Sequence, residues 1–317
     1  MLHAARCPVL HARFGSLLLS APGKARLDAG QLAAFAAIVE LGSFEAAADR
    51  LHVTPSAISQ RIKALEKQVG QVLLVRGKPC VATLAGTPLL RLAAQTAMLE
   101  AEAIAEMAGG GEAAPRPRIA MAVNADSMAT WFVRVLSELS DVLLDIRIED
   151  QDHSARLLRE GVVMGAVTTE RTPVPGCRVH PLGVMRYLPV ASADYVKRYF
   201  SAGFTEEAVA QAPSLAWNRD DALQNMLVRK AFGRPVERPV TYVPTAEGFG
   251  AAVHAGLGWG MYPEQSAEQA LADGSFVQVS DVHLDVPLFW QCWKLDSPLM
   301  ESLTATVLAA AGALRRG

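Results

Sequence analysis

Three short helical patterns follow one another within residues 28–69, and they constrain the fold of this chain more than any other feature. The first pattern ends at Gly42. Ser43 can cap the second helix and Thr54 the third, with Pro55 at the first helical position, where its missing N–H costs nothing. The inner face of the third helix is formed by apolar residues at three- and four-residue steps: Ile58, Ile62, Leu65 and Val69. Three helices in so short a segment, the last with a polar and basic outer stripe, predict a helix-turn-helix domain.

A β-hairpin with a basic tip is expected directly after the third helix. Leu73–Val75 and Val81–Leu84 have the pattern of strands, and Arg76 and Lys78 fall at the turn between them. Residues 1–108 carry 11 basic and 8 acidic side chains, although the whole chain has a formal charge of -2. The sequence therefore predicts a local basic patch, a hairpin wing included, that binds double-stranded DNA.

Short polar side chains at the start of a recognition helix can reach base edges, while cations around them contact phosphates. Here the candidates for bases are Thr54, Ser56, Ser59 and Gln60, and the candidates for phosphates are Arg61, Lys63, Arg76 and Lys78. The alternative is an ordinary solvated helix face. The hairpin and the local excess of basic residues favour the DNA-binding interpretation.

The remainder of the chain predicts a long helix followed by an α/β body. The helix, over residues 85–107, carries a narrow apolar seam: Leu89, Leu92, Thr96, Leu99, Ala103 and Met107. Such a seam favours pairing with another helix, so a homodimer or homotetramer is expected. Beyond Arg118, strands alternate with helices, one of them predicted over Ser127–Leu139, as in a largely parallel sheet. Two such lobes would enclose a cleft where small molecules bind.

Composition excludes several classes of protein. Hydrophobic residues make up 51% of the chain, which supports a buried core, yet no apolar run reaches the roughly 18 to 20 residues that cross a bilayer. The four cysteines are scattered without a CxxC or Cys/His cluster, so neither a disulfide framework nor a metal or other cofactor is expected. We interpret residues 1–26 as a poorly ordered extension rather than a signal peptide, because their apolar run is short, and we expect a cytoplasmic location.

Polar residues also follow the strands of the expected body. Asn124, Asp126 and Ser127 lie between a strand end and a helix start, where an amino acid carboxylate could bind; that Asp126 or Ser127 only caps the helix is an equal alternative. The next strand ends in residues 149–152, which hold three acids suited to a cationic ligand tail. A solvated acidic turn is the more common meaning of such a run.

The segments Gly42–Ala48 and Leu51–Glu66 closely resemble the LysR-type transcriptional regulators, and the similarity continues through Leu74–Arg76 and Thr83–Gly86. It covers residues 27–317. The resemblance implies an α/β protein with a winged helix-turn-helix domain over 27–84, a linker and dimerisation helix over 85–108 and a hinge over 109–117. A two-lobed, periplasmic-binding-protein-like effector domain follows over 118–317, with lobe I at about 118–186 and 287–317 and lobe II at about 187–286.

Within that family, six segments resemble the ArgP/LysG (IciA-like) branch: Ala122–Ser127, Ala129–Phe132, Ile148–Asp152, Gly165–Thr169, Gly256–Met261 and Val286–Gln291. This resemblance implies lysine or arginine as the effector and control of an amino acid exporter gene. A ligand that changes the separation of the lobes would alter the bend of the DNA and the access of RNA polymerase to the promoter. It favours Glu149 and Asp152, but not Asp150, as partners of the ligand tail. The weaker candidates for the α-amino group are Thr168, Thr169, Asn218, Thr245 and Glu247.

Two other classes of protein share the two-lobed α/β cleft expected here. A two-lobed α/β cleft can also host catalysis, but the chain has no GxSxG, HExxH or GxxxxGK[ST] motif, and an enzyme is not expected. A solute-binding protein would share the lobes but lack the DNA-binding head. A LysR-type regulator of another target with a different small-molecule effector is the closest alternative.

Overall fold

The computed structural model describes residues 27–107, 116–140, 142–149 and 154–316, and the chain divides into two compact units between Gly86 and Thr87. The extension over 1–26, the acids Asp150 and Asp152 and most of the expected hinge lie outside the described residues. In the described part, no helix is both long and apolar enough to span a membrane.

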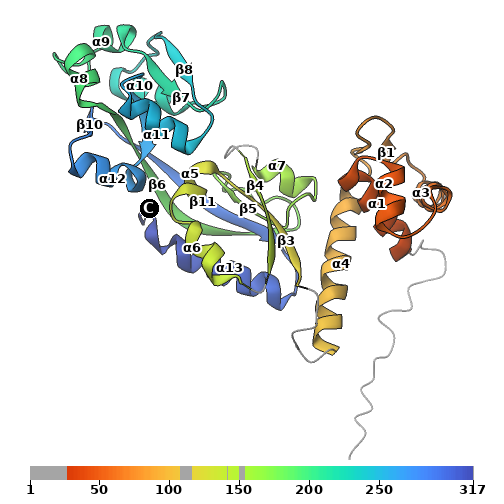
Figure 1. The fold of residues 1–317 in the computed structure, drawn as a ribbon. Coiled ribbons are helices and arrows are strands. Elements are labelled where there is room, and N and C mark those ends of the chain that lie inside the picture. Colours follow the sequence, from red (N-terminus) through yellow and green to blue (C-terminus); the bar gives the residue numbers. More distant parts are fainter. Residues whose placement is uncertain (1–26, 108–115, 141, 150–153, 317) are drawn as a thin grey trace, which may run out of the picture. The chain divides into compact units, whose positions relative to one another are not determined.

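Three helices form the core of the first unit, which we call the head: α1 (Ala29–Leu41), α2 (Phe44–Arg50) and α3 (Pro55–Val69), red to orange in Figure 1. The expected caps are confirmed, because the Ser43 and Thr54 side chains accept hydrogen bonds from the backbone N–H groups of Ala46 and Ala57. Gly42 ends α1 with a φ of 73°, a left-handed conformation that favours glycine. Ile58, Ile62 and Leu65 of α3 are fully buried against the other two helices.

A two-stranded antiparallel hairpin completes the head. Its strands, β1 (Leu74–Val75) and β2 (Val81–Ala82), are shorter than expected, and Leu74 pairs with Ala82. Leu73 and Leu74 are buried, whereas Arg76 and Lys78 at the turn are exposed. The hairpin is thus attached to the core by its base and presents its basic tip to solvent.

The second unit, which we call the body, begins with α4 (Thr87–Met107), and the two faces of this helix differ. One face packs on the body: Met98 belongs to its main hydrophobic core, and Glu102 accepts hydrogen bonds from the Ser297 hydroxyl and the Leu299 N–H. The expected apolar seam lies on another face, where Leu92 and Leu99 are 37% and 39% exposed. The seam is therefore available for a second helix.

Lobe I of the body is built on β3 (Arg118–Val123), β4 (Leu143–Ile148) and β5 (Gly165–Thr168), with β3 in the middle and parallel to both neighbours. Its helices are α5 (Ala125–Ala129), α6 (Val133–Glu138), α7 (Ser154–Arg159) and α13 (Pro298–Ala310). The single helix predicted over 127–139 was wrong. The Thr130 hydroxyl donates to the Asp126 carbonyl, and the buried Trp131 and Phe132 lie in the turn between α5 and α6.

Two long strands join the lobes, β6 (Cys177–Ser192) and β11 (Leu284–Trp293), and they run antiparallel to each other. The sheet order is β10-β6-β11-β5-β3-β4, with β9 also paired to β6, so the expectation of a largely parallel sheet was wrong for this part. Pro181 and Gly183 interrupt the strand pattern at the start of β6 and hid it in the sequence, and the register shifts there, opposite Leu288 and Phe289.

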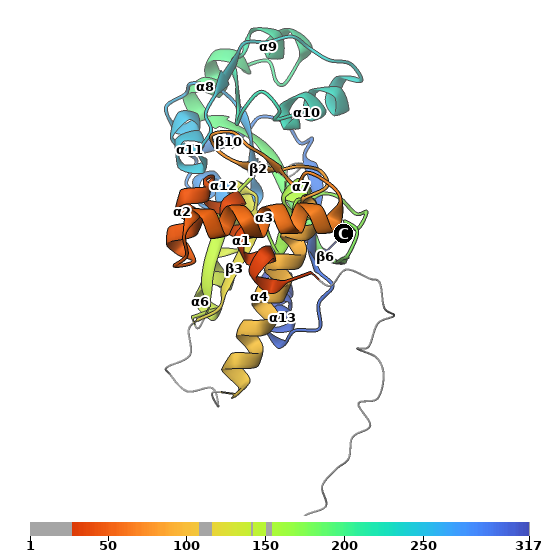
Figure 2. The same ribbon diagram turned by 90° about the vertical axis from the view of Figure 1, so that its right-hand side faces the viewer.

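Lobe II holds the remaining elements. Its strands are β7 (Ser214–Ala216), β8 (Val240–Tyr242), β9 (Gly260–Pro263) and β10 (Phe276–Gln278), and its helices are α8 (Ala193–Tyr199), α9 (Glu206–Gln211), α10 (Leu223–Phe232), α11 (Ala246–His254) and α12 (Glu264–Ala272). Figures 1 and 2 both show α8 to α11 at one end of β6 and α6 and α13 at the other. The two lobes thus share the crossing strands: β9 and β10 of lobe II pair with β6, and β5 of lobe I pairs with β11.

Candidate DNA-binding surface and effector cleft

The outer face of α3 carries the polar stripe that the sequence predicts. Ser56, Gln60 and Lys63 are exposed on the side opposite Ile58, Ile62 and Leu65, which face the core of the head. Thr54 has a second task, because its hydroxyl accepts the Ala57 N–H at 3.2 Å and caps the helix. The stripe therefore presents one amide, one hydroxyl and one ammonium group on a rigid helix.

The hairpin and the start of α3 enclose a shallow hollow on the head. Its walls are Phe44, Glu45, Pro55, Ser56, Ser59, Arg76, Gly77, Lys78 and Cys80. The guanidinium carbon of Arg76 lies 5.5 Å from the centroid of the Phe44 ring, a cation–π contact that restrains this side chain at the rim. The structure thus brings four predicted residues, Ser56, Ser59, Arg76 and Lys78, to one concave surface.

Arg61 lies apart from that surface. Its guanidinium is beside Gly30 at the start of α1, away from the hollow that Ser56 and Ser59 line. The partial burial of Arg61 agrees with this position. Arg61 therefore lies near α1 and not in the hollow, unlike the predicted phosphate contacts Arg76 and Lys78.

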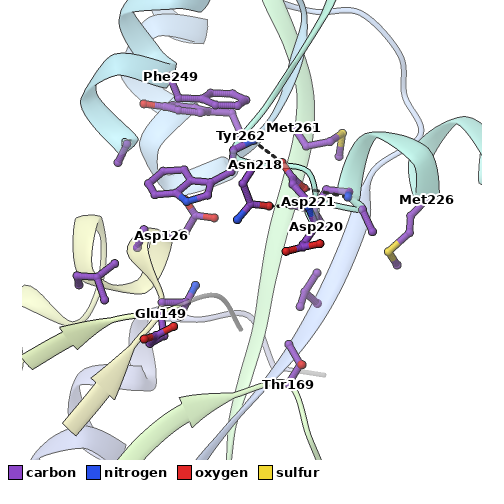
Figure 3. A pocket seen from close by; sticks show the side chains of 18 of the residues that line it. Asp126, Glu149, Thr169, Asn218, Asp220, Asp221, Met226, Phe249, Met261 and Tyr262 are labelled. Atoms are coloured by element: carbon purple, nitrogen blue, oxygen red, sulfur yellow. Dashed lines mark hydrogen bonds between the residues drawn. The ribbon is translucent and has the colours of Figure 1, made fainter. Parts of the chain in front are cut away.

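The second site is a cavity of about 580 Å³ between the two lobes of the body (Figure 3). Lobe I contributes the residues that follow β3, β4 and β5, and lobe II contributes the turn after β7 and parts of α10, α11 and β9. Asp285, Val286 and Pro287 of β11 complete the wall. The cavity has the position and size of a small-molecule site at the ends of strands.

The lobe I wall begins with Asn124 and Asp126. Asn124 is only 3% exposed, and among the described residues neither the nitrogen nor the oxygen of its side-chain amide has a hydrogen-bond partner. Asp126 Oδ2 accepts a hydrogen bond of 2.7 Å from the Tyr187 hydroxyl. Ser127 is fully buried and does not line the cavity. A buried amide without a partner is costly, and a polar ligand would satisfy it.

The ends of β4 and β5 supply Glu149 and Thr169, both of which line the cavity and are labelled in Figure 3. Thr168 does not line it: its side chain is buried, and its hydroxyl oxygen accepts the Glu170 N–H at 3.0 Å. Of the four residues predicted at these two strand ends, Asp152 lies outside the described residues, and the structure brings Glu149 and Thr169 to the cavity.

The lobe II wall is built around the turn after β7. The Asn218 Oδ1 atom accepts the N–H groups of Asp220 and Asp221, at 2.7 and 2.9 Å, and so shapes the turn that carries both acids. Asp221 in turn accepts the Trp217 N–H at 2.9 Å. Thr245 and Glu247 do not line the cavity, and the Thr245 hydroxyl oxygen accepts the Gly248 N–H and caps α11.

Sequence reasoning missed several residues of this cavity: Trp217, Asp220, Asp221, Tyr262 and Asp285. The strand-end rule that singled out Asn124 would have found the two acids after β7. Asp285 gave no such signal, because it lies within the crossing strand β11, where Arg186 of β6 donates two hydrogen bonds to it at 2.7 and 2.8 Å. These bonds hold the pKa of Asp285 below its ordinary value.

The cavity has an acidic wall. Carboxylates come from both lobes and from a crossing strand: Asp126, Glu149, Asp220, Asp221 and Asp285. Burial raises the pKa of Tyr262, and the negative charge of Asp126 raises it further. Such a wall favours a ligand with positive charge. Among the described residues, no group of three or more His, Cys, Asp or Glu side chains is arranged to hold a metal ion.

Comparison with known proteins agrees with this architecture. Residues 29–87 match the model of the bacterial regulatory helix-turn-helix proteins of the lysR family, and residues 112–311 match the LysR substrate binding domain. The chain belongs to the LysR family. It is therefore a transcription regulator with a DNA-binding head, and not an enzyme.

Its relatives include regulators named for lysine and arginine. It is 72% identical to the HTH-type transcriptional regulator LysG of Mycobacterium tuberculosis over 92% of this chain and 96% of that one. It is 40% identical to the lysine export transcriptional regulatory protein LysG of Corynebacterium glutamicum, over 89% and 97% of the two chains. The structure of full-length Corynebacterium glutamicum LysG with bound effector Arg superimposes with a TM-score of 0.76, at 39% identity, over 92% of this chain and all of that one.

Proposed function

We propose that this LysR-family regulator senses a basic amino acid, L-lysine or L-arginine, and controls the promoter of an amino acid exporter gene in the cytoplasm. The observation that carries the proposal is the acidic wall of the interlobe cavity together with the buried, unpartnered amide of Asn124. A basic amino acid offers a matching set of charges, with two cationic groups for carboxylates and one carboxylate for the amide. The names of the LysG relatives and the arginine bound to one of them support the same ligand class.

Ligand binding reaches the DNA through the lobes and the oligomer. A ligand that contacts both walls favours one lobe separation over another, provided that its affinity differs between the two states. In a homodimer or homotetramer, with the exposed seam of α4 as a pairing surface, this changes the spacing and tilt of the heads. The bend of the promoter and the access of RNA polymerase change with them.

On the DNA side, Thr54, Ser56, Ser59 and Gln60 read bases, and Arg61, Lys63, Arg76 and Lys78 contact phosphates. The exposed stripe of α3 and the hollow under the hairpin support this division. Each lost phosphate contact lowers the slope of log affinity against log salt by about 1. The double variant Arg76→Ala/Lys78→Ala is thus expected to lower that slope by about 2, whereas Lys294→Ala, in the body, leaves it unchanged. An unaltered slope in the double variant would remove both residues from the assignment.

Calorimetry with the purified full-length protein tests the effector. L-lysine or L-arginine is expected to bind, and L-leucine, which lacks the cationic tail, is not. Equal binding of leucine, or no binding of either basic amino acid, would refute the proposed ligand class. A footprint on the DNA upstream of the adjacent divergent gene, with and without lysine, then tests the target and separates this proposal from a regulator with another effector.

A further inference from the structure

A hydrogen bond connects the wall of the cavity to the strand that joins the lobes. Tyr187 is fully buried, and its hydroxyl donates to Asp126 Oδ2 at 2.7 Å. Tyr187 pairs with Leu284 of β11 on one side and with Pro263 of β9 on the other. It therefore stands where β6 leaves its pairing with the other crossing strand and enters lobe II.

Asp126 and Asn124 together offer what the head group of an amino acid needs. That group presents an ammonium and a carboxylate on one carbon, so its site requires an acceptor beside a donor. Asp126 lines the cavity as an acceptor, and Asn124, two residues before it, lines the same wall with a buried amide nitrogen that lacks a partner. A carboxylate has about four acceptor positions, so it can accept hydrogen bonds from several donors at once.

We propose that Asp126 accepts the α-ammonium group of the bound amino acid and Asn124 donates to its carboxylate, with Tyr187 as the positioning residue that fixes the Asp126 carboxylate toward the cavity. This inference rests on the proposed function, since it assumes a basic amino acid in this cavity. It assigns the tail of the ligand to the other acids of the wall, such as Glu149. It also places the recognition of the head group in direct contact with the strand that connects the lobes.

A purely structural role for Tyr187 makes a different prediction. A buried tyrosine hydroxyl needs an acceptor, and Asp126 would then be no more than that acceptor. Removing the hydroxyl would lower the stability of the body without a specific effect on the ligand. The chain offers a matched control in Tyr195, which is 3% exposed and donates to the Pro213 carbonyl at 2.6 Å, outside the lining of the cavity.

The first experiment compares the full-length variants Tyr187→Phe and Tyr195→Phe with the wild type, by calorimetry with L-lysine and with L-arginine. Loss of a hydrogen bond to a charged group predicts about ten-fold weaker binding of both ligands by Tyr187→Phe. Tyr195→Phe is expected to bind as the wild type does, although it melts at a similarly lowered temperature. Unchanged affinity in Tyr187→Phe, or an equal loss in Tyr195→Phe, would overturn the assignment of Tyr187.

The pH profile of binding supplies a reading that a structural role would not move. The hydroxyl of Tyr187 donates to the charged form of the Asp126 carboxylate, so its removal is expected to make binding by Tyr187→Phe fail at a higher pH on acidification than in the wild type. Among the described residues, the other titratable groups that line the cavity are Tyr262 of β9 and the acids Glu149, Asp220, Asp221 and Asp285. They are the same in Tyr195→Phe, which should keep the wild-type profile. Coincident profiles for the three proteins would contradict the inference.

A ligand analogue tests the group that Asp126 receives. The compound 6-aminohexanoate keeps the carboxylate and terminal ammonium of lysine but lacks the α-ammonium group. We expect the wild type to bind it at least ten-fold more weakly than lysine. Equal affinity for the two compounds would overturn the head-group assignment while leaving the proposed function intact. Absence of wild-type binding to lysine and arginine would instead overturn the proposed function.

Discussion

The head and the cleft of this LysR-family regulator are built in different ways. The candidate DNA-binding residues come from one continuous stretch, residues 54–78, on α3 and the hairpin. The lining of the cavity comes from separate segments between Asn124 and Pro287, brought together by two lobes and two crossing strands. A site on one helix depends on local periodicity, whereas a site between lobes depends on the whole body being folded around it.

The two sites also differ in their electrostatic setting. Ser56, Gln60, Lys63, Arg76 and Lys78 are exposed, so the strength of DNA binding depends on how many charges act together and on salt. In the cleft, Asn124 is almost fully buried, and the loss of one contact there leaves a polar group unsatisfied. We therefore expect each substitution in the head to lower the affinity for DNA by a small increment. A single substitution in the cleft should lower the affinity for the ligand by a larger amount.

The largest expected effect is a loss of DNA binding by the head that leaves ligand binding by the body intact. Ile62 is fully buried in the small core of the head, and Ile62→Ala should lower the free energy of unfolding of the head by about 2 to 5 kcal/mol. Operator binding, measured by fluorescence anisotropy, is then expected to fall strongly, while calorimetric binding of lysine stays at the wild-type value.

A reciprocal variant provides the control. Leu227 is fully buried in the main core of the body. Leu227→Ala should therefore weaken lysine binding more than it weakens the binding of the head to an isolated half-site. If Ile62→Ala lowered the affinities for DNA and lysine equally, the head and the body would be one cooperative unit, and the comparison between them would fail.

A second effect tests the sharper response of the cleft. Glu149→Gln removes a carboxylate of the cavity wall and keeps the shape of the side chain. Loss of one charge-assisted hydrogen bond to the ligand tail predicts weaker lysine binding by about 1.5 to 3 kcal/mol in calorimetry. Glu138→Gln, at the exposed end of α6, removes the same charge outside the cavity and should change nothing. A similar loss in both variants would mean that only the net charge of the lobe matters.

The difference between the sites also explains how far the sequence could be interpreted. The caps at Ser43 and Thr54, the inner face of α3 and the hairpin were predicted because each depends on neighbours a few residues away. The cleft was predicted only at strand ends, where Asn124, Asp126, Glu149, Thr169 and Asn218 line the cavity.

The rest of the cleft depends on contacts between distant segments. The partners Tyr187 and Asp126 are 61 residues apart, and Arg186 and Asp285 are 99 apart, so no local pattern connects them. Ser127, Thr168 and Thr245 were predicted as ligand contacts because they are polar and lie near strand ends, but they do not line the cavity. Their burial or hydrogen bonds to nearby backbone could not be foreseen without the fold.

A third, smaller effect tests base reading by the head. Gln60→Ala should lower the preference for one base position of each half-site, by about 1 to 3 kcal/mol against the wrong base. Binding-site selection measures this directly. Gln71→Ala, which removes an exposed amide just after α3, should leave the selected motif unchanged. An unchanged motif for Gln60→Ala as well would show that the stripe positions the head without reading sequence.

The smallest effect concerns the strands that join the lobes, where charge is only half-buried. The Asp285 side chain is 41% exposed, so its pair with Arg186 is screened by solvent, and Asp285→Asn should lower the stability of the body by at most about 1 kcal/mol at pH 7. Because Arg186 lowers the pKa of Asp285 in the folded state, the stabilisation is present above the unfolded pKa of about 3.9 and is lost as the pH falls through the lower folded value. Denaturation curves of the wild type and the variant should therefore converge at low pH.

Asp194→Asn, which breaks the exposed pair with Lys197, should show almost no difference in stability from the wild type at pH 7. A gap for Asp285→Asn that persisted at low pH would mean that the side chain stabilises the crossing strands by packing rather than by charge.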